Sequence, residues 1–322
     1  MLNLDDNNIK VLDPEVFSHL NSLNVLKLSG NFLVTIEKGT FEKLSELKDL
    51  SISRNKLQEI KKDLFSNVVL LESLDLSENR IQIIEPGTFD KLTNLETLDL
   101  YLNVIENVNQ YTFRGLNSLT TLKIDSNVLK VIKRDTFIYL PNLLSLSLKF
   151  NAIEELEGLE SLSVLDLSRN AIHAVGPDDF KFFTKLVTLD LSANRIICIH
   201  PDSFVSNSEL NKLSLDQNSN LILPTNDSLI NSYSLRILEL SNLNITNLPS
   251  KIFQNTPRLD TISLHGNQLE TLDKICKGIT TPSKKYAETP FSCKSYDYDH
   301  NIDRNKLDGM TRESATNYKV SP

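Results

Sequence analysis

A repeat of 24 residues constrains this chain more than any other feature, because a chain built from one short unit must stack copies of that unit. The pattern is LxxLxLxxNxIxxIxxxxFxxL. It opens at Leu23, Leu47, Leu71, Leu95, Leu119, Leu143, Leu162, Leu186, Leu210, Leu235 and Leu259. Leu2, Leu4, Asn7 and Ile9 fit the remainder of an earlier copy. The sequence therefore predicts twelve repeats, and we expect the chain to begin inside the first of them.

Each conserved position of the repeat predicts a local structure. The two Leu of LxL point to one side of a short strand and the residue between them points to the other. Neighbouring strands would pair into one continuous parallel sheet through residues 24–265. The Asn that follows can satisfy backbone groups at the turn that leaves the strand. Its positions are Asn7, Asn31, Asn55, Asn79, Asn103, Asn127, Asn151, Asn170, Asn194, Asn218 and Asn267, and Leu243 replaces it once. The Phe is expected to stack with its counterparts behind the sheet.

These columns resemble the typical 24-residue leucine-rich repeats of extracellular animal proteins, such as Toll-like receptor ectodomains, chaoptin-like adhesion proteins and the secreted acid-labile subunit. The resemblance covers about residues 1–275. It implies an α/β solenoid, a horseshoe with a parallel concave sheet and a mostly irregular or short-helical convex side. It also implies secretion or display at the cell surface, and binding of a partner mainly through the concave face.

The end of the chain departs from this pattern. We expect a solenoid over 1–275, a terminal segment over 276–293, and a polar, disordered tail over 294–322. Cys276 and Cys293 lack the four-cysteine spacing of the usual terminal cap. In a secreted protein they could form a disulfide that closes the end of the core, and free buried thiols are the alternative. The seventh repeat is five residues shorter than the others and lacks its Phe.

No motif for catalysis is present. The chain lacks GxSxG, HExxH, GxxxxGK[ST] and GxGxxG, and its five histidines fall in unrelated repeats. We therefore expect no enzyme, no cofactor and no metal. The net charge of −8 disfavours nucleic acid and anionic membrane surfaces as partners. No run of 18 apolar residues exists, so we expect no membrane span. Two N-glycosylation sequons, at Asn226 and Asn244, give weak support to secretion.

One cluster on the concave face stands out. The residues between the two Leu of each LxL are polar, and those just after are mostly small or polar. The exceptions are Tyr101 and Leu102 in the fifth repeat and Lys149 and Phe150 in the seventh. Large apolar groups on a polar surface are candidate centres of binding. We expect this to be the one place where much apolar area faces a ligand, with a charged rim of Asp99, Lys123 and Asp125. The alternative is that Leu102 and Phe150 pack down onto the turn.

Two classes of function remain open. The first is an extracellular recognition module: a receptor ectodomain, an adhesion protein or a secreted immune factor that binds another protein. The second is an intracellular repeat protein that acts as a scaffold or regulates an enzyme. The 24-residue period and the Phe column favour the first. A homodimer is compatible with either.

Overall fold

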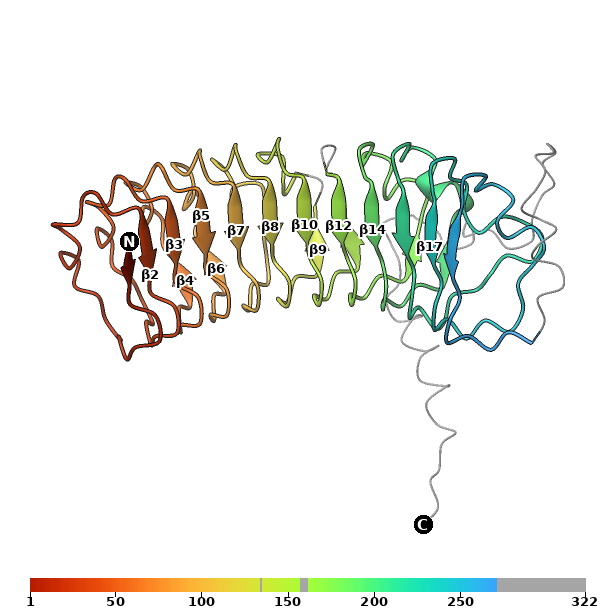
Figure 1. The fold of residues 1–322 in the computed structure, drawn as a ribbon, viewed down its shortest axis with the longest axis horizontal. Coiled ribbons are helices and arrows are strands. Elements are labelled where there is room, and N and C mark those ends of the chain that lie inside the picture. The colour runs from red at the N-terminus through yellow and green to blue at the C-terminus, as the bar shows by residue number, and fades with distance from the viewer. Residues whose placement is uncertain (134, 157–161, 271–322) are drawn as a thin grey trace, which may run out of the picture. The chain divides into compact units, whose positions relative to one another are not determined.

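The computed structural model describes residues 1–133, 135–156 and 162–270. Its main feature is a twelve-stranded sheet in which all strands are parallel and follow one another in chain order (Figure 1). The strands are β1 (Leu2–Asn3), β2 (Val25–Lys27), β3 (Asp49–Ser51), β5 (Ser73–Asp75), β7 (Thr97–Asp99), β8 (Thr121–Lys123), β10 (Ser145–Ser147), β12 (Val164–Asp166), β14 (Thr188–Asp190), β16 (Lys212–Ser214), β17 (Ile237–Glu239) and β18 (Thr261–Ser263). The predicted repeat number, register and continuous sheet are confirmed.

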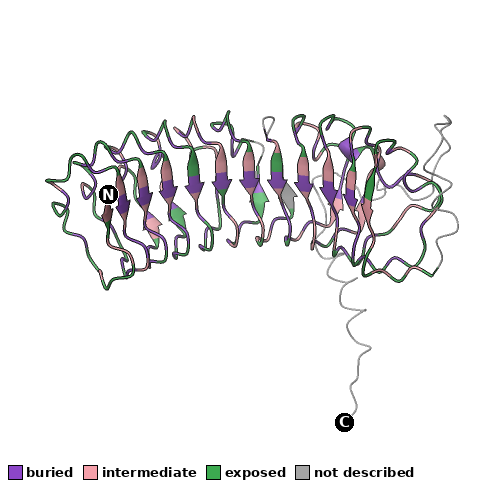
Figure 2. Ribbon diagram, viewed as in Figure 1, coloured by how far each residue is buried: buried purple, intermediate pink, exposed green. Residues whose placement is uncertain are grey.

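Alternation along each strand separates the core from the surface of the sheet (Figure 2). In β7, Leu98 is buried, whereas Thr97 and Asp99 on either side are more accessible. The same leucine position pairs from repeat to repeat, as Leu74 with Leu98 and Leu98 with Leu122. Because the side-chain period of a strand is two, this register places every such leucine in one continuous core. We call the solvent side of this sheet the sheet face.

The Asn column forms a ladder of hydrogen bonds between repeats. The Nδ2 of Asn103 donates to the carbonyl oxygens of Leu100, in its own repeat, and Leu76, in the previous one, both at 3.1 Å. Its Oδ1 accepts from the N–H of Ile81 at 2.9 Å. Buried backbone groups at the turn are thereby satisfied, as the sequence predicts.

The ladder adapts where Leu243 replaces the asparagine. The N–H of Leu221, which would meet that asparagine, donates instead to the carbonyl of Asn218 at 3.0 Å. In the next repeat, the Oδ1 of Asn267 accepts from both Leu243 and Ile245, at 2.9 and 3.1 Å. The extra residue of the tenth repeat and the bifurcated acceptor together compensate for the missing amide.

Behind the sheet, the Phe column stacks as expected. The rings of Phe17, Phe41, Phe65 and Phe89 follow one another with centroids 6.2–6.4 Å apart and nearly parallel planes. Among the described residues, the connections between the strands of the main sheet form three two-stranded pairs and one short 3-10 helix. They are β4 (Glu59–Ile60) with β6 (Ile83–Ile84), β9 (Val131–Ile132) with β11 (Glu155–Leu156), β13 (Ala174–Val175) with β15 (Cys198–Ile199), and η1 (Pro201–Phe204).

The first described repeat packs less completely than the second. Leu2, Leu4 and Ile9 are only partly buried, whereas their counterparts in the second repeat, Leu26, Leu28 and Leu33, are 0% exposed. Cys276, Cys293 and the boundaries after residues 275 and 293 lie outside the described residues. Among the residues that are described, no helix is long and apolar enough to cross a bilayer.

Candidate partner-binding surface

The four residues singled out from the sequence lie where two strands of the sheet end. Tyr101 and Leu102 follow β7, and Lys149 and Phe150 follow β10. The exposed fractions are 39% for Tyr101, 44% for Leu102 and 48% for Phe150. Leu102 and Phe150 therefore keep a large part of their side chains in solvent, and full burial against the turn is not their arrangement.

A backbone feature explains this exposure. In every repeat the residue before the Asn column has a positive φ, between 51° and 68°. These residues are Asp6, Gly30, Arg54, Glu78, Leu102, Ser126, Phe150, Arg169, Ala193, Gln217, Asn242 and Gly266. The left-handed turn lets the next residue, the asparagine, point inward. For a residue with a Cβ this conformation costs about 1–2 kcal/mol, and it is unusual for bulky side chains. Leu102 and Phe150 are the large apolar residues that occupy it here.

Two valines widen the apolar surface around Leu102 and Phe150. Val104 and Val128 directly follow Asn103 and Asn127 and are 37% and 42% exposed. We call Tyr101, Leu102, Val104, Val128 and Phe150 the trailing-edge patch, because they lie where the chain leaves the strands of the fifth to seventh repeats.

Cations flank the aromatic ring of this patch. The Nζ of Lys149 is 5.5 Å, and the guanidinium carbon of Arg169 4.7 Å, from the centroid of the Phe150 ring. Such cation–π contacts at exposed sites contribute about 0.5–1 kcal/mol. Contacts of this kind favour the orientation of Phe150 that makes them, and a preferred orientation lowers the entropy cost of burying the ring in an interface.

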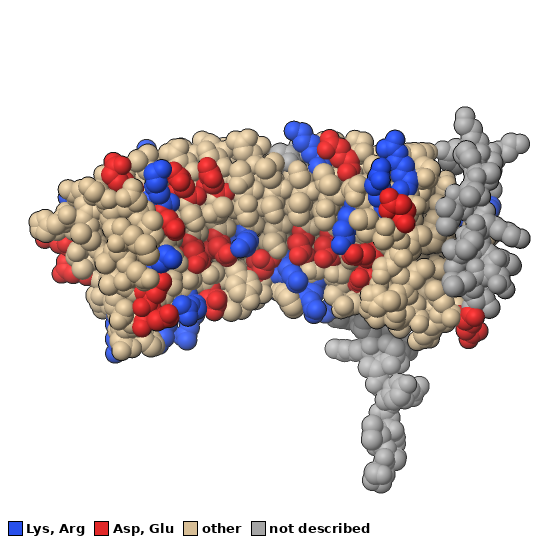
Figure 3. Space-filling view, in the orientation of Figure 1, with Lys and Arg blue, Asp and Glu red and all other residues tan. Residues whose placement is uncertain are grey.

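Acidic side chains run along the middle of the sheet face (Figure 3). One carboxylate oxygen of each accepts the N–H of the residue that leaves a strand, at 2.5–3.0 Å. Asp75, Asp99, Asp166 and Asp190 do so within their own repeat, and Asp5, Asp125 and Asp216 do so for the following one. The acidic row therefore has a structural role in capping strand ends.

Asp99, Lys123 and Asp125 are the residues expected to form a charged rim around the trailing-edge patch. Lys123 Nζ lies 3.1 Å from Asp99 Oδ2. Burial raises the pKa of the Asp125 carboxyl above its usual range, with hydrogen bonds from the Ser147 hydroxyl and the Lys149 N–H acting in the opposite direction. The nearby charges of Asp166 and Asp99 also raise this pKa. The middle of the sheet face is thus a region of negative potential.

The structure corrects the expectation of a single apolar site on this face. Leu144, Val164 and Val187 are 51%, 40% and 37% exposed and lie at the other edge of the sheet, where the chain enters the strands β10, β12 and β14. We call these three residues the leading-edge patch. The sequence interpretation considered the repeat positions within and after LxL, but not the two positions just before it. Apolar residues at those two positions, where other repeats have polar ones, would have predicted this patch.

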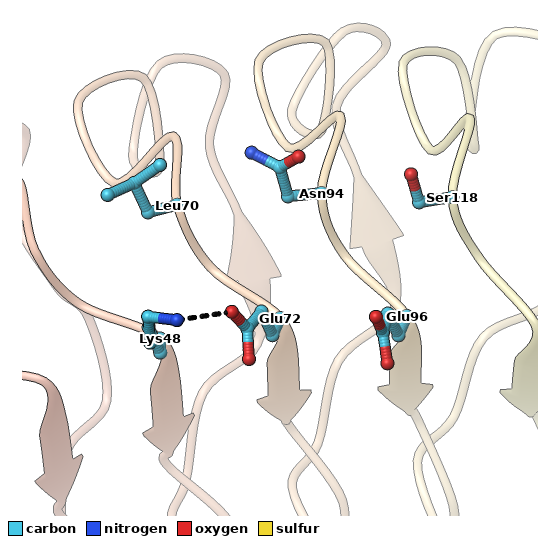
Figure 4. Close-up of a pocket in the computed structure, with 6 residues that line it drawn as sticks. All are labelled: Lys48, Leu70, Glu72, Asn94, Glu96 and Ser118. Atoms are coloured by element: carbon cyan, nitrogen blue, oxygen red, sulfur yellow. Dashed lines mark hydrogen bonds and ion pairs between the residues drawn. The ribbon is translucent and has the colours of Figure 1, made fainter.

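A shallow pocket of about 290 Å³ lies at this same edge, nearer the start of the chain. Lys48, Leu70, Glu72, Asn94, Glu96 and Ser118 line it (Figure 4). Lys48 Nζ and Glu72 Oε1 form an ion pair at 2.7 Å. The hydrogen bond and the charge of Glu72 raise the pKa of the Lys48 ammonium group. The lining consists of two side-chain columns from neighbouring repeats.

Other candidate sites are dispersed. In the described part of the chain, no three His, Cys, Asp or Glu side chains are grouped so that they could hold a metal ion. The sequon residues Asn226 and Asn244 are both exposed, in the tenth and eleventh repeats. Cys198 is partly buried in β15.

Comparisons with known proteins agree with this architecture. The model of the BspA-type leucine-rich repeat region matches residues 10–144, and the leucine-rich-repeat model matches residues 160–219. No curated protein matches in sequence.

Solved structures give a similar result. A crystal structure of a TLR13–ssRNA13 complex superposes with a TM-score of 0.70 at 27% identity over 84% of this chain. The leucine-rich-repeat domain of APL1B gives 0.67 at 22% identity over 83% of this chain and 75% of its own. The Toll–Spatzle complex of Drosophila gives 0.65 at 22% identity over 83% of this chain. The chain spans only 44% of the TLR13 chain and 34% of the Toll chain. With two repeat models that together match more than half of its residues, and with twelve strands in one parallel sheet, the chain belongs to the leucine-rich-repeat family.

Proposed function

We propose that this chain is the recognition module of an extracellular protein and binds a partner protein on its sheet face, centred on the trailing-edge patch. One observation carries the proposal. Leu102 and Phe150 hold large apolar side chains in solvent at left-handed positions, where a glycine or asparagine would fit at lower cost. Exposed apolar and aromatic groups in a polar surround are typical of binding centres.

The structural neighbours support the class of function. The Toll structure is a complex with Spatzle, a hub in development and innate immunity, and the LRIM1 structure is a complex with APL1C. TLR13 is in complex with single-stranded RNA. An RNA partner is disfavoured for this chain, because the net charge is −8 and carboxylates line the middle of the sheet face. A protein partner fits these charges better.

Extracellular placement is part of the same proposal. Both sequon asparagines are exposed, so both could carry a glycan without disturbing the core. Expression behind a secretion signal in animal cells tests this: treatment with a glycosidase should lower the apparent mass, and Asn226→Gln with Asn244→Gln should abolish the shift. An unshifted, insoluble product would favour the intracellular scaffold instead.

A binding screen tests the recognition role. Purified extracellular proteins would be screened with the wild-type chain and with the double variant Tyr101→Ala, Phe150→Ala. At a true centre at least one of the two single substitutions costs about 2 kcal/mol of binding free energy or more. Tyr111→Ala is the matched control, because Tyr111 is an exposed tyrosine outside the sheet face of the same repeat. Losses below about 0.5 kcal/mol for both substitutions, with the fold intact, would move the site elsewhere.

A further inference from the structure

The leading-edge patch lies on three adjacent repeats. The N–H of Val164 donates to the carbonyl oxygen of Leu144 at 3.0 Å, and the N–H of Val187 donates to that of Ser163 at 2.8 Å. The three apolar side chains therefore sit on adjacent repeats, within a span of about 10 Å. The residues around them are small and uncharged: Thr120, Thr121, Ser145, Ser163 and Thr188.

The same columns are charged on both sides of the patch. Toward the start of the chain they hold Lys48, Glu72 and Glu96, and toward the end they hold Arg236 and Asp260. Figure 3 shows an uncharged area beside the acidic row, with charged groups toward either end of the sheet. The apolar area is thus confined to the seventh to ninth repeats.

Uncompensated carboxylates lie directly beside this patch. Asp166 follows Val164 by two residues on β12, so the two side chains share a face about 7 Å apart. One oxygen of Asp166 and one of Asp190 cap strand ends, and the other oxygen of each has no partner among the described residues. Two cations of nearby strands are engaged with other carboxylates: Lys123 pairs with Asp99 at 3.1 Å, and Lys212 pairs with Glu239 at 2.7 Å.

An apolar patch beside unpaired carboxylate oxygens favours a partner that is both apolar and basic. We propose that the partner presents a basic segment, with Lys or Arg side chains over Asp166 and Asp190 and apolar side chains over Leu144, Val164 and Val187. An acidic partner would meet like charges, which costs several kcal/mol in an interface. A purely polar basic segment would leave the apolar patch in water. The inference rests on the proposed function, since it specifies what kind of protein that function would recognise.

Synthetic peptides test the inference without knowledge of the natural partner. The first probe is an eight-residue peptide with Leu and Arg in turn at its odd positions and Ser between them, so that an extended peptide presents both kinds of side chain on one face. The other two probes are the same peptide with Glu for Arg and the same peptide with Ser for Leu. Binding to the full chain is measured by isothermal titration calorimetry at about 0.15 M salt, where long-range attraction is screened. The Arg–Leu peptide should bind saturably at one site, and the other two at least tenfold more weakly.

Variants locate the site. Asp166→Asn with Asp190→Asn should weaken binding about tenfold, and Asn keeps the oxygen that caps the strand ends. Leu144→Ser with Val187→Ser should weaken it similarly, and both positions are exposed, so the fold should persist. The control is Glu72→Gln with Glu96→Gln, which removes the same charge from the same face and should change the affinity less than twofold. Circular dichroism checks each fold.

Three outcomes would overturn the inference: no saturable binding of the Arg–Leu peptide, equal binding of the Glu–Leu peptide, or equal loss in the aspartate and the glutamate double variants. The proposed function fails separately. If the peptide responds to the leading-edge variants while a protein partner is indifferent to Tyr101→Ala and Phe150→Ala, the inference stands and the trailing-edge centre is wrong. If Tyr101→Ala and Phe150→Ala weaken a partner that is indifferent to the leading-edge variants, the reverse holds.

Discussion

The Oδ1 of Asn127 accepts a hydrogen bond from the backbone N–H of Ile105, in the preceding repeat, at 2.9 Å. The Nδ2 of the same amide donates to the carbonyl oxygens of Leu100 and Ile124 at 3.0 and 3.2 Å. A single side chain therefore ties the turn of one repeat to the turn of the one before. Since these backbone groups are buried, no water could replace the amide at low cost.

Replacing Asn127 by Leu should lower the free energy of unfolding by about 1–3 kcal/mol, because one buried N–H and the carbonyls lose their partner. Asn103→Leu should have a similar effect. Asn107→Leu is the control, since Asn107 is an exposed asparagine of the same repeat as Asn103. Urea denaturation measures all three. Identical midpoints for Asn127→Leu, Asn103→Leu and the wild type would mean that the ladder does not stabilise the chain.

The sequence predicted this ladder because the repeat period fixes which residues are equivalent. Columns of Leu, Asn and Phe gave the register, the twelve strands and the stacked rings without further information. Local departures from the repeat could not be predicted in the same way. Asn267 accepts from two N–H groups next to Leu243, and this depends on the exact path of a turn, which the residue types do not specify.

The candidate site was predicted in part. The exposure of Tyr101, Leu102 and Phe150 followed from their columns. The left-handed backbone at Leu102 and Phe150 did not, although Gly30 and Gly266 in the same column are a hint of it. The strand-capping role of the aspartates depends on hydrogen-bond geometry, because either an Asp in the same repeat or one in the previous repeat can supply the oxygen.

Leu102→Gly should raise stability by about 1 kcal/mol, although glycine normally weakens a chain by adding freedom to the unfolded state. The reason is that Leu102 has a φ of 51°, which strains a residue with a Cβ, and that its side chain is 44% exposed. The matched control is Leu144→Gly, a similarly exposed leucine without positive φ, which should destabilise by about 0.5–1 kcal/mol. Thermal denaturation of the two variants decides the matter. A loss of stability in both would show that the backbone at Leu102 is not strained.

Binding kinetics should separate the charged rim from the apolar centre once a partner is in hand. Lys123→Ala removes one member of an exposed ion pair and should alter mainly the association rate and its dependence on salt. Phe150→Ala removes the ring and should act mainly on the dissociation rate, about tenfold or more. Surface plasmon resonance at two salt concentrations measures both. The assignment of roles is wrong if Lys123→Ala changes only dissociation.

Two carboxyl groups should give the chain's stability opposite responses to pH. Burial raises the pKa of Asp125, so between about 3.8 and that higher value the folded state binds more protons than the unfolded one. Stability from this group therefore falls as pH rises through that window. The hydrogen bonds from Arg114, at 2.9 and 2.5 Å, lower the pKa of Asp90, so its contribution is present above 3.8 and is lost as pH falls toward the lower value.

The measurement is urea denaturation of the wild type, Asp125→Asn and Asp90→Asn between pH 3 and 7. Differences from the wild type cancel the titration of all other carboxylates. Asp125→Asn cannot ionise but keeps an oxygen that accepts the Lys149 N–H. Its free energy of unfolding should therefore rise relative to that of the wild type as pH rises. Asp90→Asn removes the charge that pairs with Arg114. Its free energy of unfolding should therefore drop below that of the wild type as pH rises toward 3.8, and the difference should persist at neutral pH. If both variants differ from the wild type by an amount that varies with pH in the same way, then burial does not raise the pKa of Asp125 or Arg114 does not lower that of Asp90.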